Sequence, residues 1–293
     1  MSLLLSPMAK NSSAGFYNGV ATTSLRLAHQ DDSYLTFTPD SAGDRRKFTL
    51  SLWFKMSGPT IGGQSSNNYS RRLFSVFAGA TPNDDELHFL LRLEDDDIDV
   101  GEYAGNGNSN FRHRTDRKFR DVSAWYHLVY AFDSTQATEA NRVKLYINGV
   151  QETSFSQADY PSEDFDATVS NTVEHIIGDR AYAIMEYDGY ICRYEMVNGS
   201  QLTPSSFGEF KNGVWIAKKY TGAYGTNGFK LAFDQVGVGT ASTSTIGADT
   251  SGNTNHFTSS GIVASDCSII DSPENNFCTW NPLTAGAQTT FTE

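Results

Sequence analysis

The sequence predicts an all-β fold, an antiparallel β-sandwich of the jelly-roll kind, and three observations lead to this fold class. From Ser24 to about residue 200, strand-length runs alternate apolar and polar residues, as half-buried strands do. Aromatic residues make up 13% of the chain and occur beside abundant Ser, Thr, Asn and Gly, a combination typical of short strands joined by tight turns. No helical periodicity is sustained for about ten residues before position 200. We therefore expect about a dozen strands.

The expected elements follow one another from Ser24 onward. The strand-length runs are SLRLA, SYLTFTP, KFTLSLWFKM, RLFSVFA, LHFLLRLE, IDVGEYA, WYHLVYAFD and NRVKLYING. Asn148-Gly149 lies between VKLYI and VQETSF and predicts a type I′ hairpin, because both residue types tolerate positive φ. Thr203 as N-cap and Pro204 at the first helical position predict a single helical turn.

These patterns divide the chain into three parts. Residues 1–23 are rich in Ser, Asn, Ala and Gly and predict an N-terminal arm. Residues 24–200 form the sandwich. Residues 201–293 are poor in charge and are expected to form a C-terminal appendage that packs on the sandwich. The aromatic residues expected in the core from their strand context are Trp53, Phe54, Trp125, Tyr126 and Tyr146.

Composition excludes several classes of protein. The chain has 22 basic and 34 acidic residues, a net charge of −12, which disfavours nucleic-acid binding because phosphate contacts need a basic surface. No run of about 18 apolar residues predicts membrane insertion, and MSLLLSPMAKNSS lacks the positive start of a secretion signal. Three cysteines without a CxxC pair indicate free thiols from a reducing cytosol.

The order of several motifs resembles a known family. KFTLSLWFKM, DVSAWYHLVYAFD, NRVKLYINGVQE, HIIGDR and DGYICRYEMVNG follow one another as in laminin-G-like, concanavalin A-like sandwich domains. The flanking segments LTPSSFGEF, YGTNGFKLAF, DTSGNTNHFTSSG and DSPENNFCTWNPL are similar to laminin-G-type proteins of tailed, marine-type bacteriophages.

The resemblance implies a virion structural protein, a tail fibre, baseplate or capsid-surface component. Such a protein is made in the cytoplasm of the host bacterium and released by lysis, which explains free cysteines without a signal peptide. The expected partners are other virion proteins, further copies of the chain in a homo-oligomer, and host-surface glycans. Weak binding at each site suffices where several copies act together. Purely structural cement without a receptor is an alternative role.

A glycan depolymerase is a further alternative, because Asp97-Ile-Asp99-Val-Gly-Glu102 imitates the bulged E-x-D-x-x-E motif of related glycanases. In that motif a nucleophile and an acid/base flank the glycosidic bond about 5–5.5 Å apart. Asp97 is one methylene shorter than the Glu it replaces, and the run follows an acidic hairpin tip. We favour an acidic turn and expect no enzyme. The chain also lacks GxSxG, HExxH and P-loop motifs.

Two sets of residues are candidates for binding. Aromatic rings in or beside predicted loops can stack on the apolar face of a sugar, and these candidates are Tyr103, Phe111, Tyr160 and Tyr182. Residues 112–120 form a concentrated basic run suited to an acidic capsid or receptor surface, through Arg112, Arg114, Arg117, Lys118 and Arg120. If this run pairs with residues 97–102 as a hairpin, its cations instead lie close to Asp97, Asp99 and Glu102.

Laminin-G relatives often hold one calcium ion at the rim of the sandwich. By that resemblance Asp133 and Asp179 are candidate ligands for Ca²⁺, and capping of turns is the alternative role, which we favour. No other cofactor is expected.

Overall fold

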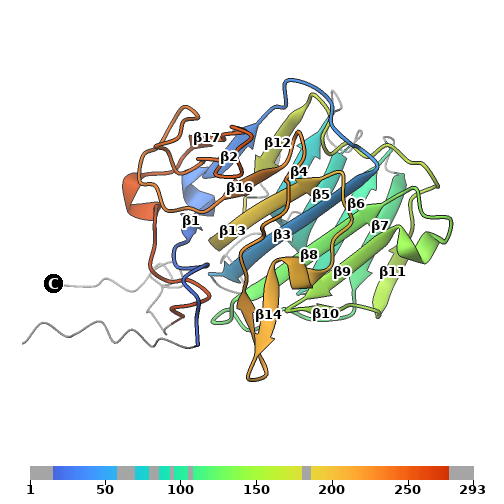
Figure 1. The fold of residues 1–293 in the computed structure, drawn as a ribbon, viewed down its shortest axis with the longest axis horizontal. Helices are drawn as coiled ribbons and strands as arrows, with labels where there is room; N and C mark the ends of the chain where they lie inside the picture. The colour runs from blue at the N-terminus through green and yellow to red at the C-terminus, as the bar shows by residue number, and fades with distance from the viewer. Residues whose placement is uncertain are drawn as a thin grey trace, which may run out of the picture.

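The structure is a computed structural model that describes residues 16–57, 70–78, 86–92, 96–104, 108–179 and 186–276. Two large sheets pack face to face, and a small two-stranded sheet stands against one of them (Figure 1). All pairs of named strands in this part of the chain are antiparallel. The predicted all-β antiparallel sandwich is confirmed.

The strands within each sheet are far apart in sequence. The seven-stranded sheet has the order β1 (Leu25–Leu27), β13 (Gly189–Asn198), β3 (Lys47–Met56), β8 (Tyr126–Asp133), β9 (Val143–Ile147) and β10 (Val150–Gln151), with β16 (Phe229–Leu231) also paired to β13. The eight-stranded sheet has the order β11 (Phe155–Asp159), β7 (Ser109–Thr115), β6 (Asp97–Tyr103), β5 (Glu86–Arg92), β4 (Ser70–Phe77), β12 (Glu174–Ile177), β2 (Tyr34–Phe37) and β17 (Thr258–Ser260). The small sheet pairs β14 (Gly208–Lys211) with β15 (Val214–Ala217). Short 3₁₀ turns are η1 (His29–Asp31), η2 (Glu139–Asn141), η3 (Pro204–Ser206) and η4 (Ala264–Asp266).

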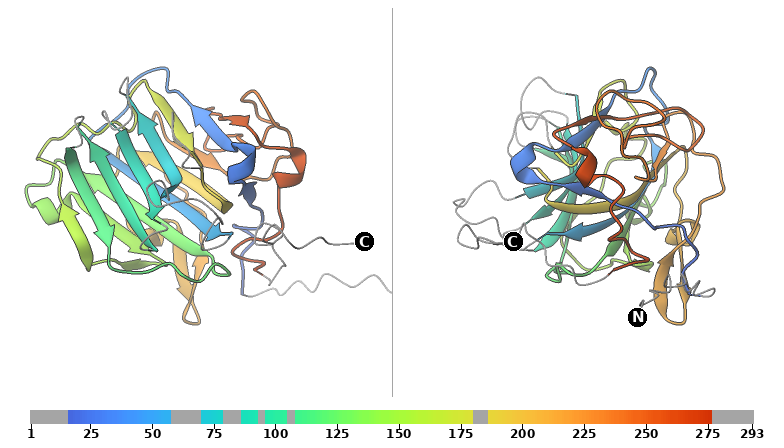
Figure 2. Two further views of the ribbon diagram at one scale, coloured as in Figure 1. Left: turned by 180° about the vertical axis from the view of Figure 1, so that it is seen from behind. Right: turned by 90° about the vertical axis from the view of Figure 1, so that its left-hand side faces the viewer.

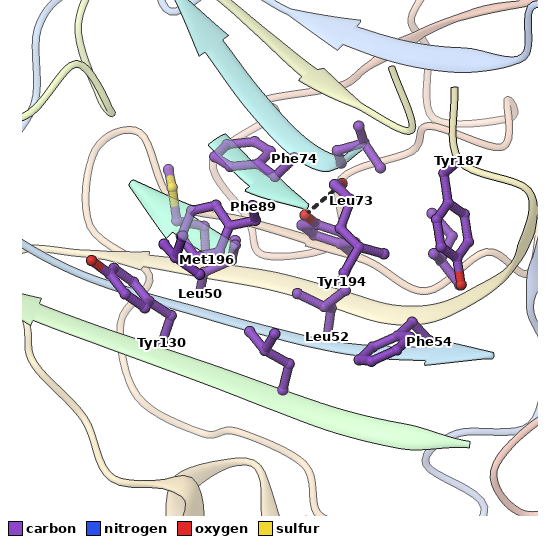
Figure 3. Packing of buried hydrophobic residues seen from close by; sticks show 14 of the residues in the cluster. Leu50, Leu52, Phe54, Leu73, Phe74, Phe89, Tyr130, Tyr187, Tyr194 and Met196 are labelled. Atoms are coloured by element: carbon purple, nitrogen blue, oxygen red, sulfur yellow. Dashed lines mark hydrogen bonds between the residues drawn. The ribbon is translucent and has the colours of Figure 1, made fainter. Parts of the chain in front are cut away.

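The main core lies between the two large sheets, and the alternation of β3 shows why. Every second residue of this strand points into it, namely Phe48, Leu50, Leu52 and Phe54. Figure 3 shows Leu50, Leu52 and Phe54 on the side of the strand that faces Leu73, Phe74 and Phe89 of the other sheet. The buried hydroxyl of Tyr194 donates a hydrogen bond to the Leu73 carbonyl oxygen at 3.0 Å, so this polar group is satisfied inside the core.

A third layer covers the outer face of the seven-stranded sheet. Trp215 of β15 stacks on His127 of β8 at 5.9 Å between ring centroids, and His127 stacks on Trp53 of β3 at 4.6 Å. The Trp215 indole Nε1 donates a hydrogen bond to His127 Nδ1 at 2.9 Å, so the imidazole carries its proton on Nε2. The Nε2–H group donates in turn to Ser51 Oγ. Burial lowers the pKa of His127 to about 3, in keeping with a neutral ring.

Residues beyond position 200 contribute strands to both large sheets of the sandwich. Strand β16 pairs with β13 of one sheet and β17 pairs with β2 of the other, so the expected boundary at residue 200 divides the sequence but not the two sheets. The predicted helical turn is η3, with Pro204 at its first position. The predicted hairpin joins β9 to β10, and Asn148 and Gly149 have φ of 50° and 80°, as a type I′ turn requires.

The first and last described segments are tied together by Glu274. Its carboxylate accepts hydrogen bonds from the backbone amides of Gly19, Val20 and Ala21 at 2.7–2.8 Å, and we call this contact the Glu274 clamp. The latter part of the expected arm is therefore docked, and residues 1–15 lie outside the described part of the chain. Figure 1 shows both segments at one side of the molecule, with β11 at the opposite side.

The cysteines match the expected free thiols in the part of the chain that the structure describes. Cys192 and Cys267 are free and buried, and Cys278 lies outside the described residues. Four of the five predicted core aromatics are buried, whereas Tyr126 is half-buried. None of the helical segments described has the length and apolar character needed to span a membrane.

Candidate glycan-binding face

Strands β6 and β7 form a hairpin whose two faces differ in chemistry. Ile98 and Val100 of β6 point into the core, and Glu102 on the same side accepts a hydrogen bond from the Thr168 backbone amide at 2.9 Å. Asp99 lies on the opposite, outer side of the sheet, where it meets Arg112 of β7. Figure 2, left, views the molecule from behind, with β4 to β7 side by side in teal.

Gly101 makes room for the side chain of Arg112 to lie across β6. The two residues are direct cross-strand partners, and a Cβ atom on Gly101 would lie 3.3 Å from both Arg112 Cγ and His88 Cε1. With that space open, Arg112 reaches Asp99 through two nitrogens, Nε to Oδ1 at 3.0 Å and Nη2 to Oδ2 at 2.5 Å. This planar two-point contact is the strong form of an arginine–carboxylate pair.

Asp99 is the charged centre of this outer face. It is fully buried, and its carboxylate also lies 3.4 Å from Arg114 Nη2 and 3.6 Å from His88 Nε2. Burial raises the pKa of Asp99, but the contacts with His88 and Arg112 outweigh this effect and hold the pKa well below its usual range. Burial lowers the pKa of His88, which is therefore neutral near pH 7. Two arginines thus share one permanently ionised carboxylate.

Strand β11 completes the surface beside this arginine pair. Gln157 lies opposite Arg114, and Asp159 lies opposite Arg112. The Gln157 amide Nε2 donates to Asp159 Oδ2 at 2.6 Å. On the other flank the half-buried ring of Tyr103 lies 5.0 Å from the ring of His88. We call the outer-side residues Tyr103, Arg112, Arg114, Gln157 and Asp159 the β6–β7–β11 face.

The rest of the basic run is paired within the chain. Arg117 Nε lies 2.5 Å from Glu152 Oε1, Lys118 Nζ lies 3.2 Å from Asp97 Oδ2, and Arg120 Nε lies 2.9 Å from Asp96 Oδ2. The hairpin alternative for the basic run is therefore confirmed for Asp97 and Asp99.

Glu102 does not belong to that charged surface, contrary to the hairpin expectation. Strands β5 and β6 pair residue by residue from Glu86–Tyr103 to Arg92–Asp97 without a bulge, so Asp99 and Glu102 point to opposite sides of the sheet. Burial raises the pKa of Glu102 to about 7. A bulge between Asp99 and Glu102 would be needed to bring both carboxylates to one glycosidic bond, but the one irregularity of β6, in its pairing with β7, lies beyond them, between Glu102 and Tyr103.

The four aromatic candidates have four different outcomes. Phe111 is fully buried in the core, and its expected place in a loop is wrong because it alternates with Arg112 on β7 and points inward. Tyr160 is half-buried against the core, with its ring 4.7 Å from His113. Tyr103 alone among the three described candidates belongs to the β6–β7–β11 face, and Tyr182 lies outside the described residues.

Asp133, a calcium candidate, caps a turn. Its Oδ1 accepts from the Thr135 backbone amide at 3.0 Å and its Oδ2 accepts from Gln136 Nε2 at 2.8 Å. Asp179, the other candidate, is half-buried, and its carbonyl oxygen accepts from Ser75 Oγ at 2.6 Å. Within the described ranges, no three His, Cys, Asp or Glu side chains gather in a group that could hold a metal ion.

Sequence reasoning missed Gln157 and Asp159, because nothing local to FSQAD indicates which strand it joins. The alternation of Phe111, Arg112, His113 and Arg114 was a usable signal, since it separates an inward set from an outward set. That signal would have moved Phe111 from the binding candidates to the core.

Comparison with known proteins gives a family match and similar solved structures. A family model described as the concanavalin A-like lectin/glucanases superfamily matches residues 29–206. Domain 4 of AbnA, a GH43 extracellular arabinanase from Geobacillus stearothermophilus in complex with arabinotriose, is 22% identical over 57% of this chain and 67% of that chain, with a TM-score of 0.37. Domains LG4-5 of the mouse laminin alpha1 chain are 13% identical over 67% and 47% of the two chains, with a TM-score of 0.38. Tailspike protein 2 from Escherichia coli O157:H7 bacteriophage CAB120 is 9% identical over 67% and 28%, with a TM-score of 0.37. None of the curated proteins matches the chain.

Proposed function

The chain belongs to the concanavalin A-like lectin/glucanase superfamily, and on that premise we propose that it binds glycans without cleaving them, as a structural component of a tailed-phage virion. The observation that carries the binding role is the β6–β7–β11 face. It sets guanidinium donors, a carboxylate acceptor and a half-buried aromatic ring side by side on neighbouring strands.

These groups match the chemistry of a sugar. Each hydroxyl group both donates and accepts hydrogen bonds, and hydrogen bonds to charged groups such as Arg114 and Asp159 contribute about 1.5–3 kcal/mol each. The apolar C–H side of a sugar ring packs on an aromatic ring such as Tyr103. Because Arg112 is already fixed by Asp99 at two points, the face loses little side-chain freedom when a ligand binds.

Two features support the virion role. The segments that follow the sandwich resemble those of laminin-G-type proteins of tailed phages, and the free thiols of Cys192 and Cys267 suit a protein assembled in a reducing cytoplasm. The strands of the β6–β7–β11 face also lie at the end of the molecule away from the Glu274 clamp, so mounting through the terminal segments would leave the face uncovered. Multiple copies in an assembled particle would compensate for weak individual sites.

Binding to host-surface polysaccharide, measured with the protein multimerised on beads, tests the proposal. We expect Tyr103→Ala to lower the affinity about tenfold, the equivalent of about 1.4 kcal/mol. Tyr17→Ala is the matched control, because it removes another partly exposed tyrosine outside the face and is expected to bind like the wild type. Failure of the multimerised protein to bind any polysaccharide would refute the adhesive role and favour structural cement.

The absence of cleavage is a separate part of the proposal. Asp99 is held by two arginines and Glu102 faces the core, so this strand offers no carboxylate pair across one sugar bond. Incubation with host polysaccharide should leave its size distribution unchanged by size-exclusion chromatography. A reduction in size that Asp99→Asn abolishes would overturn this part and establish a depolymerase.

A further inference from the structure

The charged groups of the β6–β7–β11 face balance within the chain. Arg112 and Arg114 converge on Asp99, and Asp159 stands opposite Arg112 on the neighbouring strand. At the end of the hairpin, Lys118 pairs with Asp97. On the face and at the end of the hairpin together, three cations therefore meet three carboxylates, although the sequence alone shows a concentrated basic run.

This balance works against a charged ligand. An acidic ligand approaching Arg112 meets a guanidinium already held at two points by Asp99, and it meets the exposed carboxylate of Asp159 beside it. A cationic ligand meets the two arginines. Taking an ion out of water is costly unless a free opposite charge receives it, so neither acidic nor cationic ligands gain binding free energy on this surface. An uncharged polar ligand makes charge-assisted hydrogen bonds without that cost.

Resting on the proposed glycan-binding function, we propose that the β6–β7–β11 face selects uncharged sugars and discriminates against acidic ones. Asp159 and Arg112 are direct cross-strand partners, so their Cβ atoms lie about 4.5–5.5 Å apart. The carboxylate of Asp159 and the guanidinium of Arg112 thus place a hydrogen-bond acceptor and a hydrogen-bond donor close together on the surface. Neighbouring hydroxyls of one sugar ring fit this pair, one donating to Asp159 and the other accepting from Arg112 or Arg114.

Asp159→Asn tests the inference because it removes one charge and keeps the shape of the side chain. Asp234→Asn is the matched control, since Asp234 is also exposed and likewise accepts a hydrogen bond from a glutamine, Gln235. Immobilised protein is titrated with neutral glucan, galactan and arabinan oligosaccharides and with the uronic-acid oligosaccharides of alginate and pectin. Each titration is run at about 20 mM and about 500 mM NaCl, where screening lengths differ severalfold.

We expect binding to at least one neutral oligosaccharide that changes less than about twofold between the two salt concentrations. Asp159→Asn should weaken that binding about tenfold, and Asp234→Asn should leave it unchanged. Binding confined to uronic-acid oligosaccharides, weakened by salt and strengthened by Asp159→Asn, would overturn the neutral-sugar inference and leave the glycan-binding function standing. Neutral binding that Asp159→Asn leaves intact would also overturn it. No binding to either class would instead refute the proposed function.

Discussion

The buried ion pair between Lys55 and Asp271 makes the C-terminal segment part of the folded core, and its removal can be predicted in detail. Asp271 accepts from Lys55 Nζ at 2.8 Å and from the Trp125 indole Nε1 at 3.0 Å. The two charged side chains are only 9% and 5% exposed. Among the described residues, the Lys55 ammonium has one other hydrogen-bond partner, Asn276 Oδ1 at 2.9 Å.

Asp271→Ala leaves the ammonium group and an indole N–H buried without their carboxylate. Breaking a buried pair in this way costs about 3–5 kcal/mol, a large share of the roughly 5–15 kcal/mol that holds a typical domain folded. Replacing both charges removes the uncompensated ion, so Lys55→Met combined with Asp271→Ala should recover at least half of the loss. The remainder reflects the unpaired Trp125 indole.

Urea unfolding followed by tryptophan fluorescence measures these free energies, and the midpoint should fall with little change in slope. Limited proteolysis of residues 264–276 reports whether the segment has detached. A loss below about 1 kcal/mol with the segment still protected would refute the argument that the pair is desolvated. A double variant no more stable than Asp271→Ala would refute it equally.

Three further predictions concern single residues. His113 is buried with neither ring nitrogen hydrogen-bonded, so His113→Phe should raise the free energy of unfolding by about 1–2 kcal/mol in urea titrations, and a loss of stability would contradict this. Burial raises the pKa of Glu102 from 4.5 to about 7, so the native state holds this proton more tightly than the unfolded chain does. The free energy of unfolding should therefore fall between these pH values and remain lower above them. Thermal midpoints measured across this range should show the decline, and Glu102→Gln should flatten it. Gly149 has a φ of 80°, and a Cβ atom there would lie 2.4 Å from the Trp215 ring. Gly149→Ala should therefore lower the free energy of unfolding by about 1–3 kcal/mol and alter tryptophan fluorescence. An unchanged spectrum would argue against close packing of Trp215.

Features encoded in a few adjacent residues could be predicted from the sequence. The type I′ turn at Asn148-Gly149 and the start of η3 at Pro204 depend on local backbone preferences, and both are found as expected. The contact of Asp97 and Asp99 with the basic run follows from one hairpin between consecutive strands. Such contacts need no knowledge of the rest of the fold.

The parts that escaped prediction depend on residues distant in sequence. Asp159 enters the candidate site because β11 pairs with β7, and β16 and β17 join sheets formed by strands far earlier in the chain. Glu102 was misplaced for another reason: whether a strand carries a bulge is decided by its neighbours, and β5 pairs with β6 in unbroken register.

The Glu274 clamp also has a mechanical consequence. If the protein is mounted through its terminal segments, traction on them acts on the hydrogen bonds between Glu274 and the amides of Gly19 to Ala21, together with the flanking bonds of Asn18 to Ala217 and of Asn276 to Lys55. The strands of the β6–β7–β11 face lie on the far side of the molecule, so the load on a mounted copy that holds a glycan passes through the sandwich between the face and the clamp. Flow that pulls on such a copy would therefore load the terminal contacts and the glycan-binding contacts in series, through the hydrogen-bonded strands that lie between them.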